Sequence, residues 1–99
     1  MAMFQVTSAK LKSTAGELRG MNGQFKNKKQ ELLDKEQALC QMWEGEAKNA
    51  FHAAFLRDGQ QMDAFYRLIE QYVEALLEIA KRYEIAEARN VQLASGRSY

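Results

Sequence analysis

Residues 40–47 read Cys-Gln-Met-Trp-Glu-Gly-Glu-Ala, and this stretch contains the one Trp of the chain. Long helix-period segments extend from it in both directions. Gly45 can adopt backbone angles that other residues avoid, so it can end one helix or open the next. Trp43 can bury a large apolar face while its indole N–H keeps a polar partner. We interpret the stretch as the turn of a helical hairpin locked by Trp43, although Trp-Glu-Gly alone would favour a chance occurrence inside one continuous helix.

The segment before the turn is typical of a single long helix. Thr7 can cap the free N–H groups of its first turn, and Val6 and Leu11 fit a hydrophobic staple. One apolar row recurs every seven residues, as in a helix packing seam, and consists of Leu11, Leu18, Phe25, Leu32 and Leu39. The neighbouring row is weak and consists of Ala15, Asn22, Lys29 and Glu36. This helix is therefore expected to present a narrow apolar edge.

The segment after the turn predicts a longer helix that opens near Glu46. Glu44 and Glu46 place negative charge at the positive end of this helix. Its seam alternates steps of four and three residues for about five heptads, and only Asp58 breaks its apolar character. The seam consists of Phe51, Phe55, Asp58, Met62, Phe65, Ile69, Tyr72, Leu76, Ile79, Tyr83 and Ala86. Between residues 62 and 80 the stripe widens, so this part should face more than one neighbouring helix.

These patterns predict an all-α fold in a single domain covering residues 1–99. We expect one helix over about 8–41, a turn over about 42–45, a second helix over about 46–90 and a flexible tail over 91–99. A hairpin so long and thin leaves an apolar face exposed, which predicts a partner. Two hairpins side by side give a four-helix bundle, and a twofold homodimer is the commonest solution. A related chain as heterodimer partner remains open.

Composition narrows the possible functions. The chain has 14 basic and 13 acidic residues and a net charge of +1, so there is no electrostatic argument for nucleic acid or an anionic membrane. No apolar run approaches the roughly 20 residues of an integral membrane segment. The absence of Pro favours uninterrupted helices. The first residues lack the basic start and apolar core of a cleaved signal peptide, a test that alone predicts a cytoplasmic protein.

Cys40 and His52 are the residues to weigh for chemistry. Cys40 adjoins an apolar seam position and is predicted to be a small buried hydrophobe, with a reactive or intermolecular thiol as the alternative. His52 has no Cys or second His at ligand spacing, which favours a solvated side chain over a metal ligand. A nucleophile and base pair would need a third group to orient it in a pocket, and none is visible. The sequence therefore predicts no catalysis, metal site or cofactor.

The chain resembles the WXG family of secreted proteins about one hundred residues long, also called ESAT-like. The resemblance covers nearly the whole chain and rests on its length, two long helices without Pro and the central Trp43-Glu44-Gly45. It also rests on residues 83–87, Tyr-Glu-Ile-Ala-Glu, which match the family's Tyr-x-x-x-Asp/Glu signal late in the second helix. Tyr66 and Glu70 have the same spacing, but Tyr83 and Glu87 lie at the helix end, where the family carries the signal.

The resemblance implies a substrate of a type VII secretion system. Such proteins fold as hairpins, dimerise and are exported folded without a cleaved signal peptide, so the chain would be cytoplasmic before export and secreted afterwards. The secretion ATPase would be a partner. The implied recognition element has two parts, the turn motif of Trp43 and Gly45 and the export signal of Tyr83 and Glu87. A cytosolic adaptor or chaperone of the same fold, escorting a larger effector, is the alternative.

Helix geometry gives this two-part signal a constraint of its own. Trp43 and Tyr83 are 40 residues apart in the sequence, or roughly 60 Å along a helix, so they cannot form one site within a chain. In an antiparallel dimer, the turn of one chain would lie near the far end of the second helix of its partner.

Overall fold

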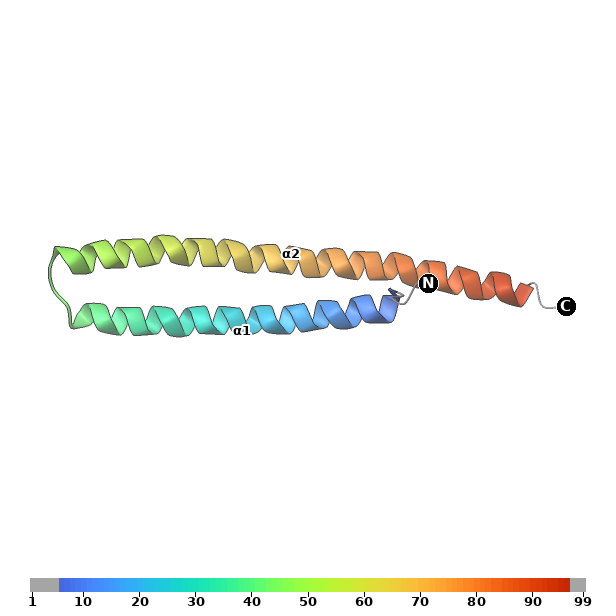
Figure 1. Cartoon of the computed structure of the whole chain (residues 1–99), viewed down its shortest axis with the longest axis horizontal. Helices are drawn as coiled ribbons and strands as arrows, with labels where there is room; N and C mark the ends of the chain where they lie inside the picture. The colour runs from blue at the N-terminus through green and yellow to red at the C-terminus, as the bar shows by residue number, and fades with distance from the viewer. Residues whose placement is uncertain (1–5, 97–99) are drawn as a thin grey trace, which may run out of the picture.

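The computed structural model describes residues 6–96, and the side chains of residues 6–93. Two helices form an antiparallel hairpin in it: α1 spans Ser8–Gln41 and α2 spans Glu46–Gly96 (Figure 1). The molecule is a rod whose principal extents are 83 × 23 × 15 Å. These observations confirm the predicted all-α hairpin. Neither helix, within the described residues, is apolar enough over a sufficient length to cross a membrane.

Local chemistry explains where α1 begins and where α2 opens. Thr7 has an extended backbone, and its hydroxyl accepts a hydrogen bond from the Lys10 N–H at 3.1 Å, as predicted for an N-cap. At the other end, the Met42 N–H donates to the Leu39 carbonyl at 3.0 Å and closes the last turn of α1. Gly45 then adopts a φ of +117°, a conformation that L side chains rarely adopt. The turn therefore depends on a glycine at this position.

Helix α2 is longer than expected. The sequence predicted an end near residue 90, but the helix continues to Gly96, so residues 91–96 are helical and not the start of a flexible tail. The segment contains no Pro and includes the helix formers Gln92, Leu93 and Ala94, so nothing in it stops propagation. The remainder of the predicted tail, residues 97–99, lies outside the described residues. As a result α2 extends well past the start of α1 (Figure 1).

The seam between the two helices is built from small and polar side chains. Ala15, Val73 and Ala80 are fully buried. On α1 the buried residues are Ser8, Ala15, Asn22 and Glu36, which repeat at heptad spacing. The row expected to be the weaker one therefore faces α2. The row of large apolar residues, expected to form the packing seam, lies beside it. Small side chains let the helices approach closely, and the large apolar residues flank the seam.

Polar contacts across the seam fix how the helices are aligned. The Asn22 side-chain amide donates to the Tyr66 carbonyl at 3.0 Å and to Glu70 Oε2 at 3.1 Å, which satisfies its buried polar group. Lys29 forms an ion pair with Asp63. These contacts join residues far apart in the sequence, so they hold the antiparallel alignment along the middle of the rod.

Candidate interaction surface and the two ends of the hairpin

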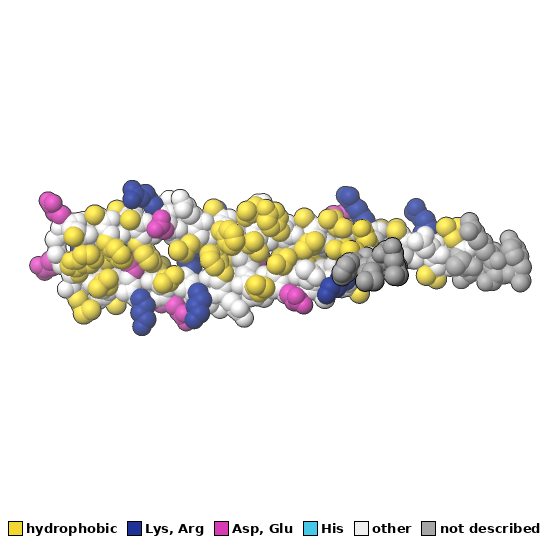
Figure 2. Space-filling model, viewed as in Figure 1, with side chains coloured by type: hydrophobic (Ala, Val, Ile, Leu, Met, Phe, Trp, Pro, Cys, Tyr) yellow, Lys and Arg dark blue, Asp and Glu magenta, His cyan; other side chains and the backbone are white. Residues whose placement is uncertain are grey.

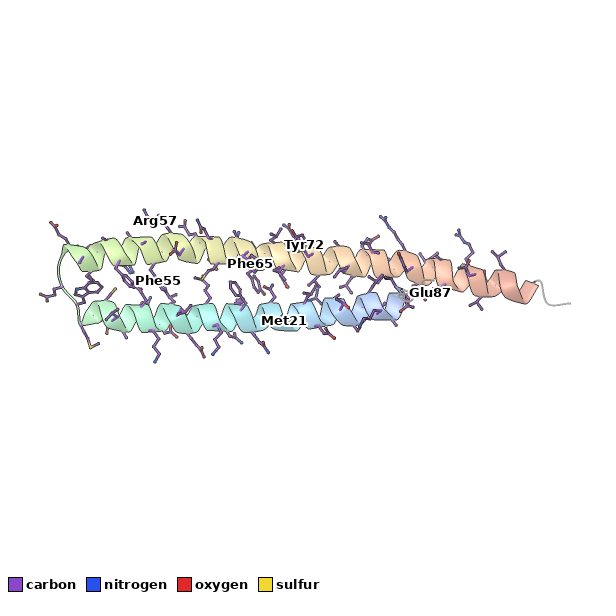
Figure 3. The ribbon with its side chains drawn as sticks, in the orientation of Figure 1. Met21, Phe55, Arg57, Phe65, Tyr72 and Glu87 are labelled. Carbon is purple, nitrogen blue, oxygen red and sulfur yellow. The ribbon has the colours of Figure 1, made fainter. Side chains whose placement is uncertain are left out.

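One face of the hairpin carries large apolar side chains that the chain itself does not cover. Figure 2 shows hydrophobic side chains in a band along the rod, and Figure 3 shows Phe55 and Phe65 directed between the helices. Several predicted seam residues are between 41% and 53% exposed: Leu32, Leu39, Phe51, Phe65, Tyr72 and Ile79. The others are half-buried: Leu11, Leu18, Phe25, Phe55, Met62, Ile69 and Leu76. We call this set the apolar face.

The apolar face is hollowed where the two helices meet. One shallow hollow of about 240 Å³ lies between the helices near their middle. Its lining consists of Leu18, Met21, Asn22, Phe25, Phe65 and Ile69. The Phe25 and Phe65 rings meet edge to face with centroids 5.4 Å apart, so the lining is ordered by an aromatic contact. A hollow of this size and composition can receive an apolar side chain from another helix.

The turn end is organised by aromatic rings. Trp43 is half-buried, and its ring lies against Phe51 with centroids 5.8 Å apart. Phe51 in turn lies 6.3 Å from Phe55, centroid to centroid. The Trp43 ring thus connects the turn to the first part of the apolar face, as expected for a residue that locks the turn. Gly45, beside it, supplies the positive φ.

At the open end of the hairpin, where α1 begins, Glu87 of α2 holds the two helices together through hydrogen bonds from Ser8. The Ser8 N–H donates to Glu87 Oε1 at 2.9 Å, and the Ser8 hydroxyl donates to Oε2 at 3.0 Å (Figure 3). The carboxylate therefore lies at the positive end of α1. Lys12 and Glu84 add an ion pair at 2.8 Å nearby. Tyr83 is 42% exposed. No motif in the sequence predicted this contact between Glu87 and Ser8.

A single chain does not bring the two predicted motifs together. Trp43 lies at the turn, and Tyr83 and Glu87 lie at the open end of the rod. The separation along α2 is roughly 55 Å, from the rise per residue of a helix. Any site that contains both motifs has to combine two chains.

The other Tyr-x-x-x-Glu segment, residues 66–70, makes contacts with α1 of the same chain. The Tyr66 carbonyl and Glu70 both accept hydrogen bonds from Asn22. The Lys26 ammonium lies 5.3 Å from the centroid of the Tyr66 ring, a cation–π contact. Tyr66 is half-buried, whereas Tyr83 is exposed. Of the two segments, residues 83–87 leave their Tyr more accessible to a partner.

Glu36, Cys40 and His52 form a polar cluster near the turn that the sequence analysis missed. The Glu36 side chain is 2% exposed. Its Oε1 accepts from Cys40 Sγ at 2.9 Å and lies 2.5 Å from His52 Nδ1. Bonds from the thiol and the imidazole hold the pKa of Glu36 below its ordinary value, and the same carboxylate raises the pKa of the Cys40 thiol. Two expectations are therefore corrected: Cys40 is not simply a buried hydrophobe, and His52 is not simply solvated.

This cluster supplies the third group that a cysteine nucleophile would need, but in the wrong arrangement. The carboxylate contacts both the thiol and the imidazole, while Cys40 Sγ and His52 Nδ1 are 4.0 Å apart. A catalytic cysteine requires a lowered thiol pKa, and here the pKa is raised. Both features argue against Cys40 as a catalytic nucleophile. The spacing of Glu36 and Cys40, one helical turn apart, was the signal available in the sequence.

The chain matches a protein family by sequence and a solved structure by fold. A family model, WXG100, described as proteins of 100 residues with WXG, matches residues 3–88. The hairpin resembles the crystal structure of a secreted protein, EsxB, from Bacillus anthracis strain Sterne. That match has 22% identity and a TM-score of 0.79, and covers 88% of this chain and 99% of the other.

A wild-type crystal structure of the same protein, in space group P21, gives 23% identity and a TM-score of 0.74, with 84% of this chain and 89% of the other covered. At these identities the likeness establishes the fold. No curated protein matches the chain by sequence.

Proposed function

The chain belongs to the WXG100 family, and from this membership we propose that it is a small protein exported by a type VII secretion system that acts through protein–protein contacts. The family match over residues 3–88 supports the proposal. The fold supports it too, since the similar EsxB is described as a secreted protein. The pKa of the Cys40 thiol is raised, so the proposed role is binding and not catalysis by this cysteine.

The observation that carries the proposal is the uncovered apolar face. Monomeric soluble proteins rarely leave a contiguous apolar surface of this kind in water. The face follows the heptad row of α1 and the seam of α2, so its side chains are spaced to interlock with another helical hairpin. A second copy of the chain is the simplest occupant, and a related family member is the alternative. The proposed assembly is an antiparallel four-helix bundle.

Antiparallel pairing would also assemble the two-part export signal. The turn of one protomer, with Trp43 and Gly45, would lie beside Tyr83 and Glu87 of its partner, and the secretion ATPase would read this composite surface. The exposure of Tyr83 and the free end of α2 beyond Ser8 support this part of the proposal. Tyr66 is half-buried and its ring contacts Lys26, whereas Tyr83 is exposed, which supports residues 83–87 as the signal.

An export assay in cells with an active type VII system tests the proposal. Tyr83→Ala is expected to stop export without loss of helicity, because the ring is 42% exposed. Tyr66→Ala, with the same local spacing, is the matched control and is expected to be exported. Export of Tyr83→Ala at the rate of the unmodified chain would refute the assigned signal. Retention of the unmodified chain in the cell would favour the adaptor or chaperone role instead.

A mixed dimer tests whether recognition crosses the interface. A Trp43→Ala chain paired with a Tyr83→Ala chain has one end with both motifs intact and one end with neither. If the secretion machine reads one complete end, this mixed dimer should leave the cell, while neither mutant homodimer should. Failure of the mixed dimer, with both chains folded and paired, would contradict a composite site at a single end.

A further inference from the structure

We propose that Glu36, Cys40 and His52 form a binding site for a zinc-like divalent transition-metal ion at the turn end of the hairpin. The three side chains offer a carboxylate oxygen, a thiol sulfur and an imidazole nitrogen. These ligand atoms all lie within 4.8 Å of one another. The inference depends on these side chains alone and is independent of the proposed export.

The distances between the three ligand atoms lie on either side of those in a tetrahedral metal site. Two protein ligands of one tetrahedral zinc ion lie roughly 3.3–3.6 Å apart. In the structure, Glu36 Oε1 is 2.9 Å from Cys40 Sγ and 2.5 Å from His52 Nδ1, and Sγ and Nδ1 are 4.0 Å apart. Opening the two short contacts and closing the long one by less than about 1 Å each would reach the metal-bound spacing.

A second observation points to a missing ligand. Glu36 Oε2 is buried and has no hydrogen-bond partner, in a side chain that is 2% exposed. A buried carboxylate oxygen without a partner costs free energy because its desolvation is not compensated. Within the described residues it is the one buried side-chain oxygen or nitrogen left unsatisfied. A cation bound by both oxygens of the Glu36 carboxylate, together with Cys40 and His52, would compensate this oxygen.

The donor set selects the class of metal. Cysteine, histidine and a carboxylate together suit zinc and similar borderline-soft ions, whereas magnesium and calcium take oxygen ligands. Three protein ligands leave a fourth position for water, and the His52 side chain, 40% exposed, provides access from solvent. Binding would displace the Cys40 thiol proton into solvent and use the neutral imidazole with its proton on Nε2.

A bound ion would connect the two helices beside the turn. Glu36 and Cys40 lie one turn apart near the end of α1, and His52 lies in the second turn of α2. The Lys48 charge acts on both Glu36 and Cys40 and would oppose a divalent cation. Lys48→Met is therefore expected to tighten metal binding, which is a signature that a purely structural cluster would not give.

Cobalt substitution tests the site on the full-length, untagged chain under a non-chelating reductant. Cys40 is the only cysteine and His52 the only histidine, so a near-ultraviolet thiolate-to-cobalt band can arise only from Cys40. We expect one Co²⁺ per chain with this band, and its displacement by Zn²⁺. Absence of the band at saturating Co²⁺ would overturn the proposal, whatever the behaviour of variants.

Variants then assign the ligands. Cys40→Ser, His52→Ala and Glu36→Gln, each checked for helicity, are expected to weaken Zn²⁺ binding in chelator competition by at least about 100-fold, more than loss of an outer-shell partner alone. Glu31→Gln is the matched control, because Glu31 is an exposed acid of α1 paired only with Lys28. Equal Zn²⁺ affinity for the unmodified chain and all three ligand variants would show adventitious binding and overturn the site.

Discussion

At the scale of single residues, Glu87 combines a predicted recognition role with an observed structural one. Its carboxylate accepts two hydrogen bonds from Ser8 at the start of α1. The predicted export signal is therefore also a fastening of the hairpin. An export defect in a Glu87 variant could therefore have two causes: loss of the recognised carboxylate, or loss of the hydrogen bonds that hold the open end together.

Ser8→Ala separates these two causes. The change removes the hydroxyl bond to Glu87 and keeps the backbone N–H bond, so urea unfolding should show a loss of about 0.5–1.5 kcal/mol. Because Tyr83 and Glu87 are unchanged, export should continue. If Ser8→Ala stops export as completely as Glu87→Ala does, fastening of the end, and not the Glu87 carboxylate itself, is what export requires.

Gly45 and Gly20 give opposite expectations for the same substitution. A Cβ at either position would meet nothing within 4 Å in the hairpin, so packing does not distinguish them. Gly45 has a φ of +117°, and Gly45→Ala should cost at least about 1 kcal/mol of backbone strain. Gly20 lies within helix α1, where Ala is favoured over Gly by about 1 kcal/mol.

The thermal unfolding midpoints of Gly45→Ala and Gly20→Ala, measured at one protein concentration, check these two expectations. Gly45→Ala should melt below the unmodified chain and Gly20→Ala above it. A destabilised Gly20→Ala would mean that another backbone approaches Gly20 in the assembly, which is a contact that the single hairpin does not contain.

At the scale of the helices, the Lys29–Asp63 pair makes hairpin stability depend on pH. The hydrogen bond from Lys29 holds the pKa of Asp63 below its ordinary value. A carboxyl with a lowered folded-state pKa contributes stability above the unfolded pKa of about 4, and this contribution is lost as pH falls through the folded value.

The midpoint of thermal unfolding, compared between the unmodified chain and Asp63→Asn from pH 7 to pH 2, should reveal this contribution. The unmodified chain should melt higher near neutral pH, and the difference should shrink toward zero at the acid end. Asp34→Asn, an exposed acid on α1 that accepts from Gln30, controls for the loss of one negative charge. A difference for Asp63→Asn that does not vary with pH would contradict a stabilising ion pair.

The helices also show what the sequence could and could not predict. Heptad spacing predicted both helices, Trp43 and Gly45 predicted the turn, and Thr7 predicted the start of α1. Periodicity does not say which of two adjacent rows faces the other helix, so the row of Ala15, Asn22 and Glu36 was undervalued. The cluster of Glu36 with His52 also requires that these two side chains lie on the facing sides of α1 and α2, which heptad spacing does not determine.

At the scale of the whole molecule, the apolar face predicts self-association. Phe65→Asp should cost an isolated hairpin the edge-to-face contact with Phe25, about 1 kcal/mol, but should bury an unpaired charge in a dimer and cost several kcal/mol there. Sedimentation of the unmodified chain at micromolar concentration should give a dimer, and Phe65→Asp should give a helical monomer or a largely unfolded chain.

Ala64→Asp is the control for that experiment. Ala64 is exposed and lies one residue, or about 100° of helix rotation, away from Phe65, so the same charge should leave the dimer intact. A monomeric unmodified chain with full helicity would show that the apolar face is stable in water without a copy of itself.

The position of the open end has a mechanical consequence. Ser8 and Glu87 lie together where the paired part of the hairpin ends opposite the turn, so a force that pulls the start of α1 away from α2 acts first on the Ser8–Glu87 contacts. The contacts between α1 and α2 would then break one after another from the open end toward Trp43. They would not break simultaneously, as they would if the two helices were pulled past each other. Tension applied at this end in an optical trap should therefore unravel the hairpin at much lower force than tension applied along the rod between its turn and its open end.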